Sequence, residues 1–391
     1  MDPFSVTRRR LLQASAAAGA AMSLGVSASF APEPASRQRG APFAVGDYAA
    51  KVTELRDQVR RLVRGWVDAG RLVRPDGFVY AVDVAQLMAC FVDAGDAGGY
   101  AALRDRALAH LVVDDESDPY TRGFVLWRYR PDDAGATRDA SGTTEALRTA
   151  RALWLGAERF DAPGDRQLAR TILGGYARHQ AVDHGVWMVR NYFGFGTRSF
   201  ATNSFLIDYD PDFVRDAARE SGDAELAALA EKSYAAVRGA LTPAGLLYDL
   251  IQPELKTMYP LLENVATFSP NDVVQVSNAT TVANTVARGA PDVAARVLKF
   301  ATDRLSRGPG ALRMYHYGRT GEAVNDASPG INEWGGLVRL AAALRDREAT
   351  ASLLGYAVAS WDYYYNQLKP DAPDAYVASE ALAAMSGVLA L

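Results

Sequence analysis

The feature that most constrains this chain is an alternation of short and long connections between helical segments. From residue 45 onward, apolar residues recur at three- and four-residue spacing, which predicts helices nearly throughout. We expect them at about 45–69, 80–95, 98–113, 139–159, 164–181, 210–221, 223–240, 271–288, 291–306, 330–345, 348–366 and 377–391. Short links with turn residues, such as Asp96-Ala-Gly-Gly, join the helices in pairs. Long loops at 114–138, 182–209, 241–270 and 307–329 separate the pairs.

Helices joined by short links pack as antiparallel neighbours, so the chain predicts about six helical hairpins. About twelve helices paired in this way form an all-α (α/α)6 toroid, with inner and outer helices around one core. We therefore expect one domain over 45–391. The long loops, each before an inner helix, would emerge on one face and form a cleft, and loops of this length are usually functional. The run Leu111 to Val113 and the segment Gly185 to Val189 could be short strands, but no alternating pattern is long enough for a sheet.

The N-terminal residues 1–31 predict a twin-arginine export signal. Adjacent arginines in the run Thr7-Arg-Arg-Arg-Leu-Leu precede a weakly apolar stretch that ends in small-residue cleavage sites. Residues 32–44 are expected to be a linker. We therefore expect an exported protein, periplasmic or secreted, with no stable membrane span after signal removal. A mitochondrial-type leader and a short anchor are the alternatives.

Charge, cysteine and motif content argue against several function classes. The net charge is −4 and no long basic run follows the N-terminus, so nucleic acid is not an expected partner. The one cysteine, Cys90, allows no intramolecular disulfide. The four histidines form no His-x-x-x-His pair, and no Cys-x-x-Cys or glycine-rich phosphate loop is present. We therefore expect no cofactor and no metal.

Acidic and amide residues mark the starts of the expected inner helices. They are Asp83, Asp139 with Glu145, Asp208 with Asp210 and Asp212, Asn271 with Asp272, and Asn332 with Glu333. The helix at 139–159 is expected to begin at Asp139 or Ser141, because either side chain can accept the free amides of a first turn. Each acid taken alone is also an ordinary N-cap. In an (α/α)6 toroid, however, these residues converge on one end.

Aromatic residues in the same loops complete the predicted cleft. Aromatic faces stack on the C–H faces of sugar rings, and carboxylates and amides bind sugar hydroxyls, so this composition predicts a carbohydrate partner. The expected substrate-binding residues are Tyr80, Trp127, Tyr129, Arg190, Tyr192, Asn271, His316, Glu333 and Trp334. The expected catalytic residues are Asp83, Asp139, Glu145, Asp208 and Asp272.

Three stretches between 124 and 250 resemble the six-hairpin glycosidases, and most of all glycoside hydrolase family 8. Trp127-Arg-Tyr followed by Ala136-Thr-Arg-Asp is similar to a family segment that ends in an Ala-Thr-x-Asp helix start. Ala201-Thr-Asn-Ser-Phe, with the Ser221-Gly-Asp-Ala segment after it, is similar to a second family run. Gly245-Leu-Leu-Tyr-Asp is similar to its Gly-Leu-x-x-Asp turn. The resemblance implies an (α/α)6 fold, a sugar ligand, and a substrate-binding or transition-state-stabilising role for Asp139.

The chain departs from that family at the general acid. The family has Glu in a Ser-Glu-Gly segment, whereas this chain has Tyr80-Ala-Val-Asp, which makes Asp83 the nearest substitute. Hydrolysis of a glycoside needs one carboxyl group that protonates the leaving oxygen and a second that activates water or attacks the sugar. Asp83 and Glu145 are the candidate acids. Asp272 and Asp208, with Glu333 behind them, are the candidate bases.

Two other functions stay open at this point. A polysaccharide lyase on the same scaffold would use Tyr192 with Asn191 and Arg190, or His316, to act on a uronate. A non-catalytic glycan-binding envelope protein would bind sugar without turnover. We favour an exported glycoside hydrolase that uses carboxylate acid–base catalysis.

Overall fold

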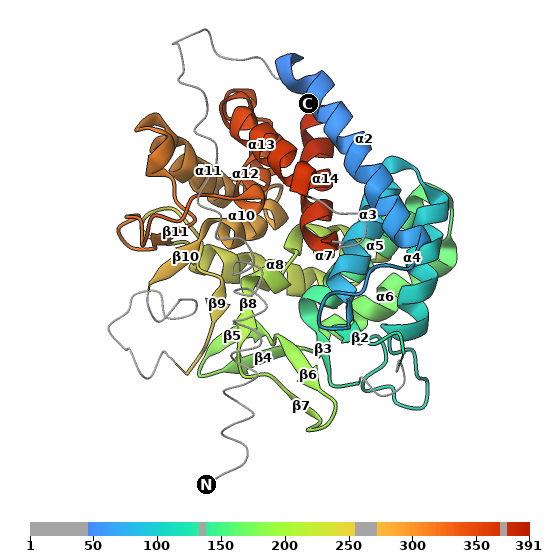
Figure 1. The fold of residues 1–391 in the computed structure, drawn as a ribbon. Coiled ribbons are helices and arrows are strands. Elements are labelled where there is room, and N and C mark those ends of the chain that lie inside the picture. Colours follow the sequence, from blue (N-terminus) through green and yellow to red (C-terminus); the bar gives the residue numbers. More distant parts are fainter. Residues whose placement is uncertain (1–45, 133–137, 255–271, 368–373) are drawn as a thin grey trace. The chain divides into compact units, whose positions relative to one another are not determined.

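The computed structural model describes residues 46–132, 138–254, 272–367 and 374–391 (Figure 1). All of them belong to one compact unit that spans 42–391. The predicted signal (1–31) and linker (32–44) lie outside the described residues and stay predictions. No described helix is long and apolar enough to cross a membrane.

The described residues contain twelve α-helices, at nearly the positions that the periodicity predicts. The helices that follow long loops are α3 (Ala81–Ala94), α5 (Thr143–Phe160), α7 (Pro211–Ser221), α10 (Val276–Thr285), α12 (Ile331–Ala343) and α14 (Ala375–Leu389). Their partners are α2 (Gly46–Asp68), α4 (Ala97–His110), α6 (Pro163–Ala177), α8 (Ala224–Gly239), α11 (Pro291–Ser306) and α13 (Arg347–Gln367).

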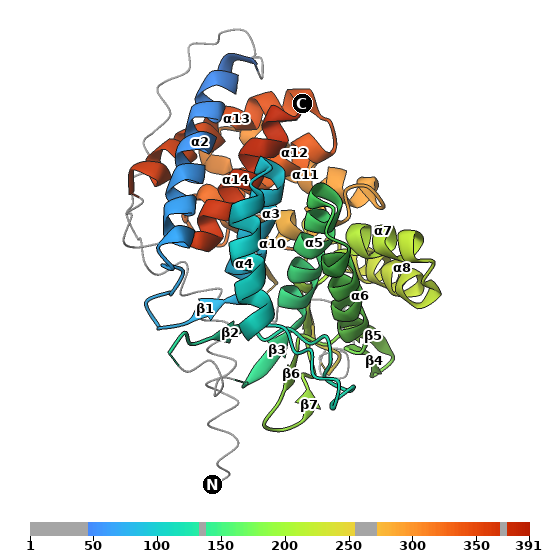
Figure 2. The ribbon, with the colours of Figure 1, turned by 90° about the vertical axis from the view of Figure 1, so that its right-hand side faces the viewer.

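Packing of these helices follows the predicted hairpins. Helix α3 packs on α4, α5 on α6, α7 on α8, α10 on α11, and α12 on α13, while α2 packs on α14 (Figures 1 and 2). The helices that follow long loops also contact one another: α14 packs on α3 and α12, α3 on α5, and α12 on α10. Between α5 and α10 the circuit is completed by the short 3-10 helix η1 (Leu206–Asp208) and by α7. The contacts therefore form a closed inner ring, whose lining is a continuous apolar core.

Short strand pairs precede several inner helices, and of these strands the sequence suggested only the one within Gly185 to Val189. The strands are β1 (Val79–Tyr80), β2 (Arg128–Tyr129), β3 (Ala140–Gly142), β4 (Gln180–Asp183), β5 (Val186–Val189), β6 (Tyr192–Gly194), β7 (Ser199–Phe200), β8 (Ser204–Phe205), β9 (Leu250–Ile251), β10 (Val273–Gln275) and β11 (Tyr315–Tyr317). They form antiparallel pairs β1–β2, β4–β5, β8–β9 and β10–β11, and one three-stranded sheet β3–β6–β7. These pairs order the long loops at the N-terminal ends of the inner helices.

The start of α5 corrects one expectation. Asp139 and Ser141 do not cap this helix, because the N-cap is Gly142 and residues 140–142 form β3. Strand β3 pairs with β6, from the following long loop. The residues whose backbone N–H groups an Asp139 or Ser141 cap would have bound thus have an extended backbone and pair with a neighbouring strand.

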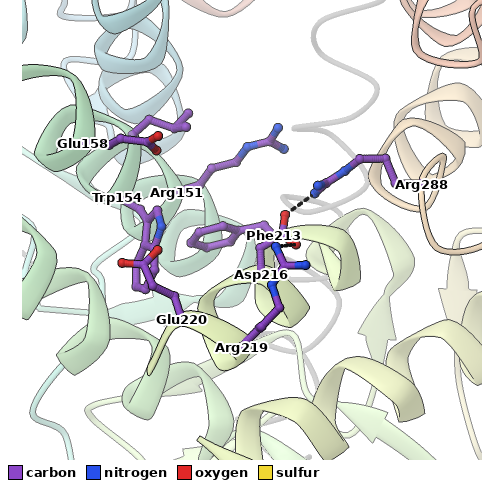
Figure 3. A pocket seen from close by; sticks show the side chains of 9 residues that line it. Arg151, Trp154, Glu158, Phe213, Asp216, Arg219, Glu220 and Arg288 are labelled. Atoms are coloured by element: carbon purple, nitrogen blue, oxygen red, sulfur yellow. Dashed lines mark hydrogen bonds and ion pairs between the residues drawn. The ribbon is translucent and has the colours of Figure 1, made fainter. Parts of the chain in front are cut away.

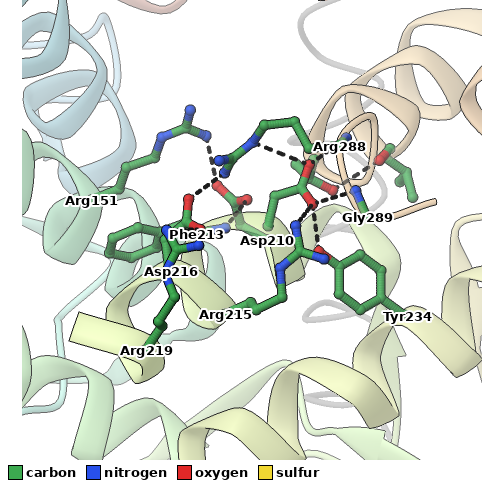
Figure 4. A network of polar contacts seen from close by, with 12 residues as sticks. Arg151, Asp210, Phe213, Arg215, Asp216, Arg219, Tyr234, Arg288 and Gly289 are labelled. Carbon is green, nitrogen blue, oxygen red and sulfur yellow. Dashed lines mark hydrogen bonds and ion pairs between the residues drawn. The ribbon is translucent and has the colours of Figure 1, made fainter. Parts of the chain in front are cut away.

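Asp212, in the first turn of α7, ties that helix to the chain after α10, where Figure 4 labels Arg288 and Gly289. It accepts hydrogen bonds from the backbone N–H groups of Arg288 and Gly289, both at 2.9 Å, and from the Tyr234 hydroxyl. Only 4% of Asp212 is exposed, so these donors compensate a buried carboxylate. The contact fixes the connection between α10 and α11 against α7 and α8.

Substitution of Gly289 by alanine is expected to weaken this junction. A Cβ atom at residue 289 would overlap the ring and hydroxyl of Tyr234, which Asp212 holds in place. We expect a loss of about 1–3 kcal/mol of unfolding free energy, as is typical of overpacking, measured by chemical denaturation. Gly174→Ala in α6 is the matched control, because a Cβ atom added there would have no neighbouring atom within 4 Å. Equal stability of the two variants would contradict the prediction.

Candidate active site

Four carboxylates gather at the N-terminal ends of the inner helices. Asp83 lies in the first turn of α3, Glu145 in the first turn of α5, Asp208 in η1 before α7, and Asp374 at the N-cap of α14. Their charges act on one another. The charge of Asp374 raises the pKa of Asp83, that of Asp83 raises the pKa of Glu145, and that of Glu145 raises the pKa of Asp208. We call these four residues the acid cluster. Asp208 was a predicted site residue and lies beside Glu145, whereas Asp374 was not predicted.

Asp83 is held in an ion pair with Arg74, from the loop before β1. The Arg74 Nε and Nη2 atoms lie 2.8 and 2.6 Å from the two Asp83 carboxylate oxygens. Burial raises the pKa of Asp83, which is 1% exposed, although Arg74 acts in the opposite direction. Both oxygens are occupied by the guanidinium, so the structure does not support Asp83 as a proton donor to a substrate.

Glu145 has the properties that Asp83 lacks. Its side chain is half-buried and turns back over the N-terminus of α5, where a Cβ atom at Gly142 would overlap the carboxylate. Burial is the main cause that raises the pKa of Glu145, and the charge of Asp83 adds to it, while Arg148 and Arg74 act against it. A carboxyl group that keeps its proton at higher pH and retains contact with solvent is suited to general acid catalysis.

Asp208 is more deeply enclosed. It accepts hydrogen bonds from the Thr144 hydroxyl and, at 3.3 Å, from the Phe205 backbone N–H, and it is 2% exposed. Burial raises the pKa of Asp208 to about 7, and the neighbouring Glu145 charge contributes. Its enclosure argues against direct activation of a water molecule, so its predicted role as base loses support to Asp272.

The raised pKa of Asp208 predicts a particular pH dependence of stability. An unfolded aspartate titrates near pH 4, so between about pH 4 and 7 the folded protein binds a proton that the unfolded chain has released. The stabilisation from this proton is complete below pH 4 and is lost as the pH rises through about 7. We expect the unfolding free energy of Asp208→Asn to show a weaker decline across this window than wild type, measured by urea denaturation at pH 4.5 and 7.5. Identical slopes would contradict it.

Asp139 stands at the rim, beside half-buried aromatic and cationic side chains. Its carboxylate accepts a hydrogen bond from Trp127 Nε1 at 2.7 Å and lies 3.4 Å from Arg128 Nη2. The Arg128 guanidinium lies over the Trp127 ring, 3.9 Å from its centroid. Tyr80 packs edge-on against Trp127 at 5.7 Å and donates its hydroxyl to Asp76 at 2.5 Å. Since 44% of the Asp139 side chain is exposed, this group can reach a substrate hydroxyl.

Asp139 and Glu145 lie near each other along the chain path. The Glu145 carboxylate lies over Gly142, and Gly142 follows Asp139 by three residues of extended chain. Three extended residues span at most about 11 Å. The rim around Asp139 and the acid cluster are therefore neighbouring parts of one face.

Asp272 precedes β10 and α10 and has a strained backbone, with φ at +56°. Its carboxylate accepts hydrogen bonds from the Tyr248 hydroxyl and, at 3.2 Å, from the Arg319 backbone N–H. About 21% of the side chain is exposed, which leaves it open to water. A left-handed backbone at an aspartate, with the carboxylate fixed by neighbours, is typical of a residue held for function.

Three predicted substrate-binding residues serve the fold instead. Tyr129 is 3% exposed and stacks on His110, with ring centroids 4.6 Å apart. Trp334 is 7% exposed and stacks on Tyr356 at 4.7 Å. The Glu333 carboxylate accepts the N–H of the N-cap residue of its own helix at 2.8 Å, as in a capping box. The structure places none of these three side chains at an open surface.

The other predicted binding residues differ in their burial and surroundings. His316 is fully buried, with both ring nitrogens hydrogen-bonded to backbone groups, so it offers no nitrogen to a ligand. Arg190 lies over the Phe200 ring, 3.8 Å from its centroid, and donates to a backbone carbonyl. Tyr192 is half-buried in β6, opposite the last residue of β3, and so lies near the acid cluster. Asn271 lies outside the described residues.

Sequence reasoning missed two cations of this face, Arg74 and Arg148. Arg74 contacts Asp83 from a loop nine residues upstream, and only the folded loop reveals the pair. Arg148 lies three residues after Glu145 on α5, a spacing that marks the same helix face and was available in the sequence.

Asp249, whose pKa burial raises, accepts a hydrogen bond from Asn278 at 2.5 Å. Among the described residues, no group of three or more His, Cys, Asp and Glu side chains could hold a metal ion.

A pocket of about 530 Å³ lies elsewhere, between the second half of α5 and α7 (Figure 3). Its charged groups largely pair with one another or with neighbours: Arg288 lies 2.6 Å from Asp216, and Arg151 bonds to the N-cap of α7. Trp154 and Phe213 at its base are at least 94% buried. These rings leave no open face for a sugar, so we do not place the candidate site here.

No family model and no curated protein match this chain. Solved structures do match it. A β-1,3-1,4-glucanase from Paenibacillus sp. X4 superposes with a TM-score of 0.63 at 14% identity, over 86% of this chain and 93% of that chain. An α-amylase from Clostridium perfringens gives a TM-score of 0.62 at 15% identity, over 79% and 86%. The fold is that of the six-hairpin glycosidases.

A third match names the family that the sequence resembles. A GH8 xylobiose complex from Teredinibacter turnerae gives a TM-score of 0.51 at 18% identity, over 80% of this chain and 82% of that chain. These matches confirm the predicted all-α (α/α)6 fold and the likeness to glycoside hydrolase family 8 structures. At identities of this size, the shared property is the fold.

Proposed function

We propose that this protein is an exported glycoside hydrolase that cleaves a polysaccharide or oligosaccharide. The observation that carries the proposal is the acid cluster at the N-terminal ends of the inner ring, with an open rim of Trp127, Arg128 and Asp139 beside it. The six-hairpin fold, which glucanase, amylase and xylobiose-binding structures share, supports a carbohydrate substrate. The Arg-Arg motif and the apolar stretch after it support export through the twin-arginine route, to the periplasm or beyond.

The mechanism assigns one role to each of three carboxyl groups. Glu145 holds a proton and transfers it to the glycosidic oxygen as the leaving group departs. Asp272, which is open to solvent, accepts a proton from the water that attacks the sugar. Asp139 accepts hydrogen bonds from sugar hydroxyls and favours the positive charge that develops on the ring in the transition state. Trp127 and Tyr80 provide the aromatic surface beside it.

Substitution of Asp139 by asparagine tests the site. We expect reducing-sugar release, surveyed over bacterial and plant polysaccharides, to fall about 10–100-fold, because one charge-assisted contact to the transition state is lost. Asp303→Asn on α11 is the matched control, since that aspartate is exposed and pairs with Lys299 on its own helix. Equal activity of Asp139→Asn and wild type on the best substrate would sink the assignment.

A non-catalytic glycan-binding protein is the second candidate, and one observation favours it. At the position where the resemblance puts the general acid, Asp83 is locked by Arg74. Saturable glycan binding without any release of reducing ends would establish this alternative. The lyase hypothesis loses one of its two candidate bases, because the two nitrogens of His316 are already bonded to the backbone.

A further inference from the structure

One carboxylate, Glu380 in α14, joins four of the inner helices. Gln86 from α3 donates a hydrogen bond to it. Arg339 from α12 approaches with Nη1 at 3.2 Å, and Arg148 from α5 approaches with Nη1 at 3.6 Å. The Glu380 side chain is 18% exposed, so these contacts lie in a largely enclosed part of the ring. The four helices are thus connected by polar contacts close to the acid cluster.

The charges at this junction do not balance. Two guanidinium groups share the single negative charge of Glu380, so Glu380 only partly neutralises the charge of Arg148. Arg148 follows Glu145 by three residues on α5, so the two side chains lie on the same helix face. Tyr376 of α14 lies on another side of Arg148, with its ring centroid 5.8 Å from the guanidinium carbon. Arg148 therefore stands between the proposed general acid and a fixed carboxylate on another helix.

From this arrangement we infer that Arg148 is a positioning residue, shared between Glu145 and Glu380, which orients the Glu145 carboxyl group and sets its charge state. The inference rests on the proposed function, because it assigns Arg148 a task in the reaction of Glu145. Glu380 acts indirectly, through Arg148. Because it holds the guanidinium, it limits how strongly Arg148 can attract the Glu145 carboxylate.

Other charged groups also face Glu145, and they set the background for this effect. They are Arg74 before β1, Asp83 on α3 and Asp208 in η1, together with Arg148 itself. Arg148 in turn faces Glu380 and Tyr376 on α14. Of these, Arg74 is committed to Asp83 through two hydrogen bonds. Arg148 is the cation whose attraction for the Glu145 carboxylate can be changed by a substitution on a different helix.

Two substitutions should move the proton affinity of Glu145 in opposite directions. Glu380→Gln removes a negative charge and releases Arg148 toward Glu145, so the Glu145 carboxylate is favoured and its pKa falls. Arg148→Met removes the cation, so the protonated form is favoured and the pKa rises. We expect each shift to be about one pH unit, the lower end of the effect of a close charge. The high-pH limb of kcat/KM should move with it, downward in the first variant and upward in the second.

Arg148→Lys separates orientation from charge. Lysine keeps the positive charge but lacks the planar guanidinium with which Arg148 approaches Glu380. We expect the pH limb to stay within a few tenths of a unit while kcat falls by about tenfold at unchanged KM. A residue that only filled space would show neither the opposite shifts nor this split.

Titration of the Glu145 carboxyl carbon by NMR makes the test independent of turnover. The signal is identified by its absence in Glu145→Gln, and Arg151→Met is the control, since Arg151 lies one turn further along α5 and pairs with Asp210 on α7. Unmoved titration in Glu380→Gln, or the same direction of shift in Glu380→Gln and Arg148→Met, would overturn the inference. Opposite shifts in a protein that releases no sugar would refute the hydrolase proposal and leave only the electrostatic coupling.

Discussion

Glu145→Gln should reduce kcat by about 10²- to 10⁴-fold while the protein remains folded. This is the usual contribution of a general acid, and glutamine keeps the size and position of the side chain without a proton to give. The loss should be measured on the best natural substrate found in the polysaccharide survey, with circular dichroism as the check on folding. Glu158→Gln, on the exposed face of the same helix, is the matched control and should leave kcat unchanged.

The leaving group provides a second check on Glu145. An aryl glycoside with an acidic phenol needs little protonation, so Glu145→Gln should retain far more of its activity on that substrate than on a polysaccharide. Wild-type kcat/KM should also decline at high pH, as Glu145 loses the proton that burial helps it to keep. An equal loss on both kinds of substrate would point to a structural role and would remove Glu145 from the mechanism.

Arg74→Met should be the most destabilising of the substitutions considered, by about 3–5 kcal/mol. The change leaves the Asp83 carboxylate buried at 1% exposure without the guanidinium that bonds to both of its oxygens. Methionine roughly preserves the apolar stem, so the loss reports the unpaired charge rather than a cavity. Urea denaturation at pH 7 is the measurement.

The double variant Arg74→Met with Asp83→Leu tests the reason for that loss. When both partners are replaced by apolar groups of similar size, no charge remains buried, and most of the stability should return. The double variant should therefore be more stable than Arg74→Met alone. If it were less stable, packing rather than charge would explain the effect of the first substitution.

Helix positions were predictable because they depend on local periodicity. The stripe Val52, Leu55, Val59 and Val63 marks one face of α2, and all four of these side chains are buried. Short turn-rich links then indicated which helices are neighbours, and the observed pairs follow them. Errors concentrate where two- or three-residue strands precede a helix: α10 begins at Val276 because β10 takes Val273–Gln275. Such strands are too short to carry a period, and their partners lie tens of residues away.

The acids of the candidate site were also predictable, but their partners were not. Asp83, Glu145 and Asp208 were expected at the starts of inner helices, and the structure brings them into one cluster. Arg74 escaped notice because a loop returns it to Asp83, which no local pattern records. His316 misled for the opposite reason. A histidine between two tyrosines looks available in a sequence, whereas its surroundings in the fold satisfy both nitrogens.

The contact between α2 and α14 joins the first described helix to the last. Helix α14 also fills the place between α3 and α12, so three helices that are made earlier share this one partner. Since α14 is the last of the described helices to be made, the ring cannot close until α14 has been synthesised and has left the ribosome. Until then the parts of α2, α3 and α12 that α14 covers in the ring stay exposed, which is a state that chaperones recognise. A messenger truncated before α14 would thus yield a chain that remains in this open state permanently.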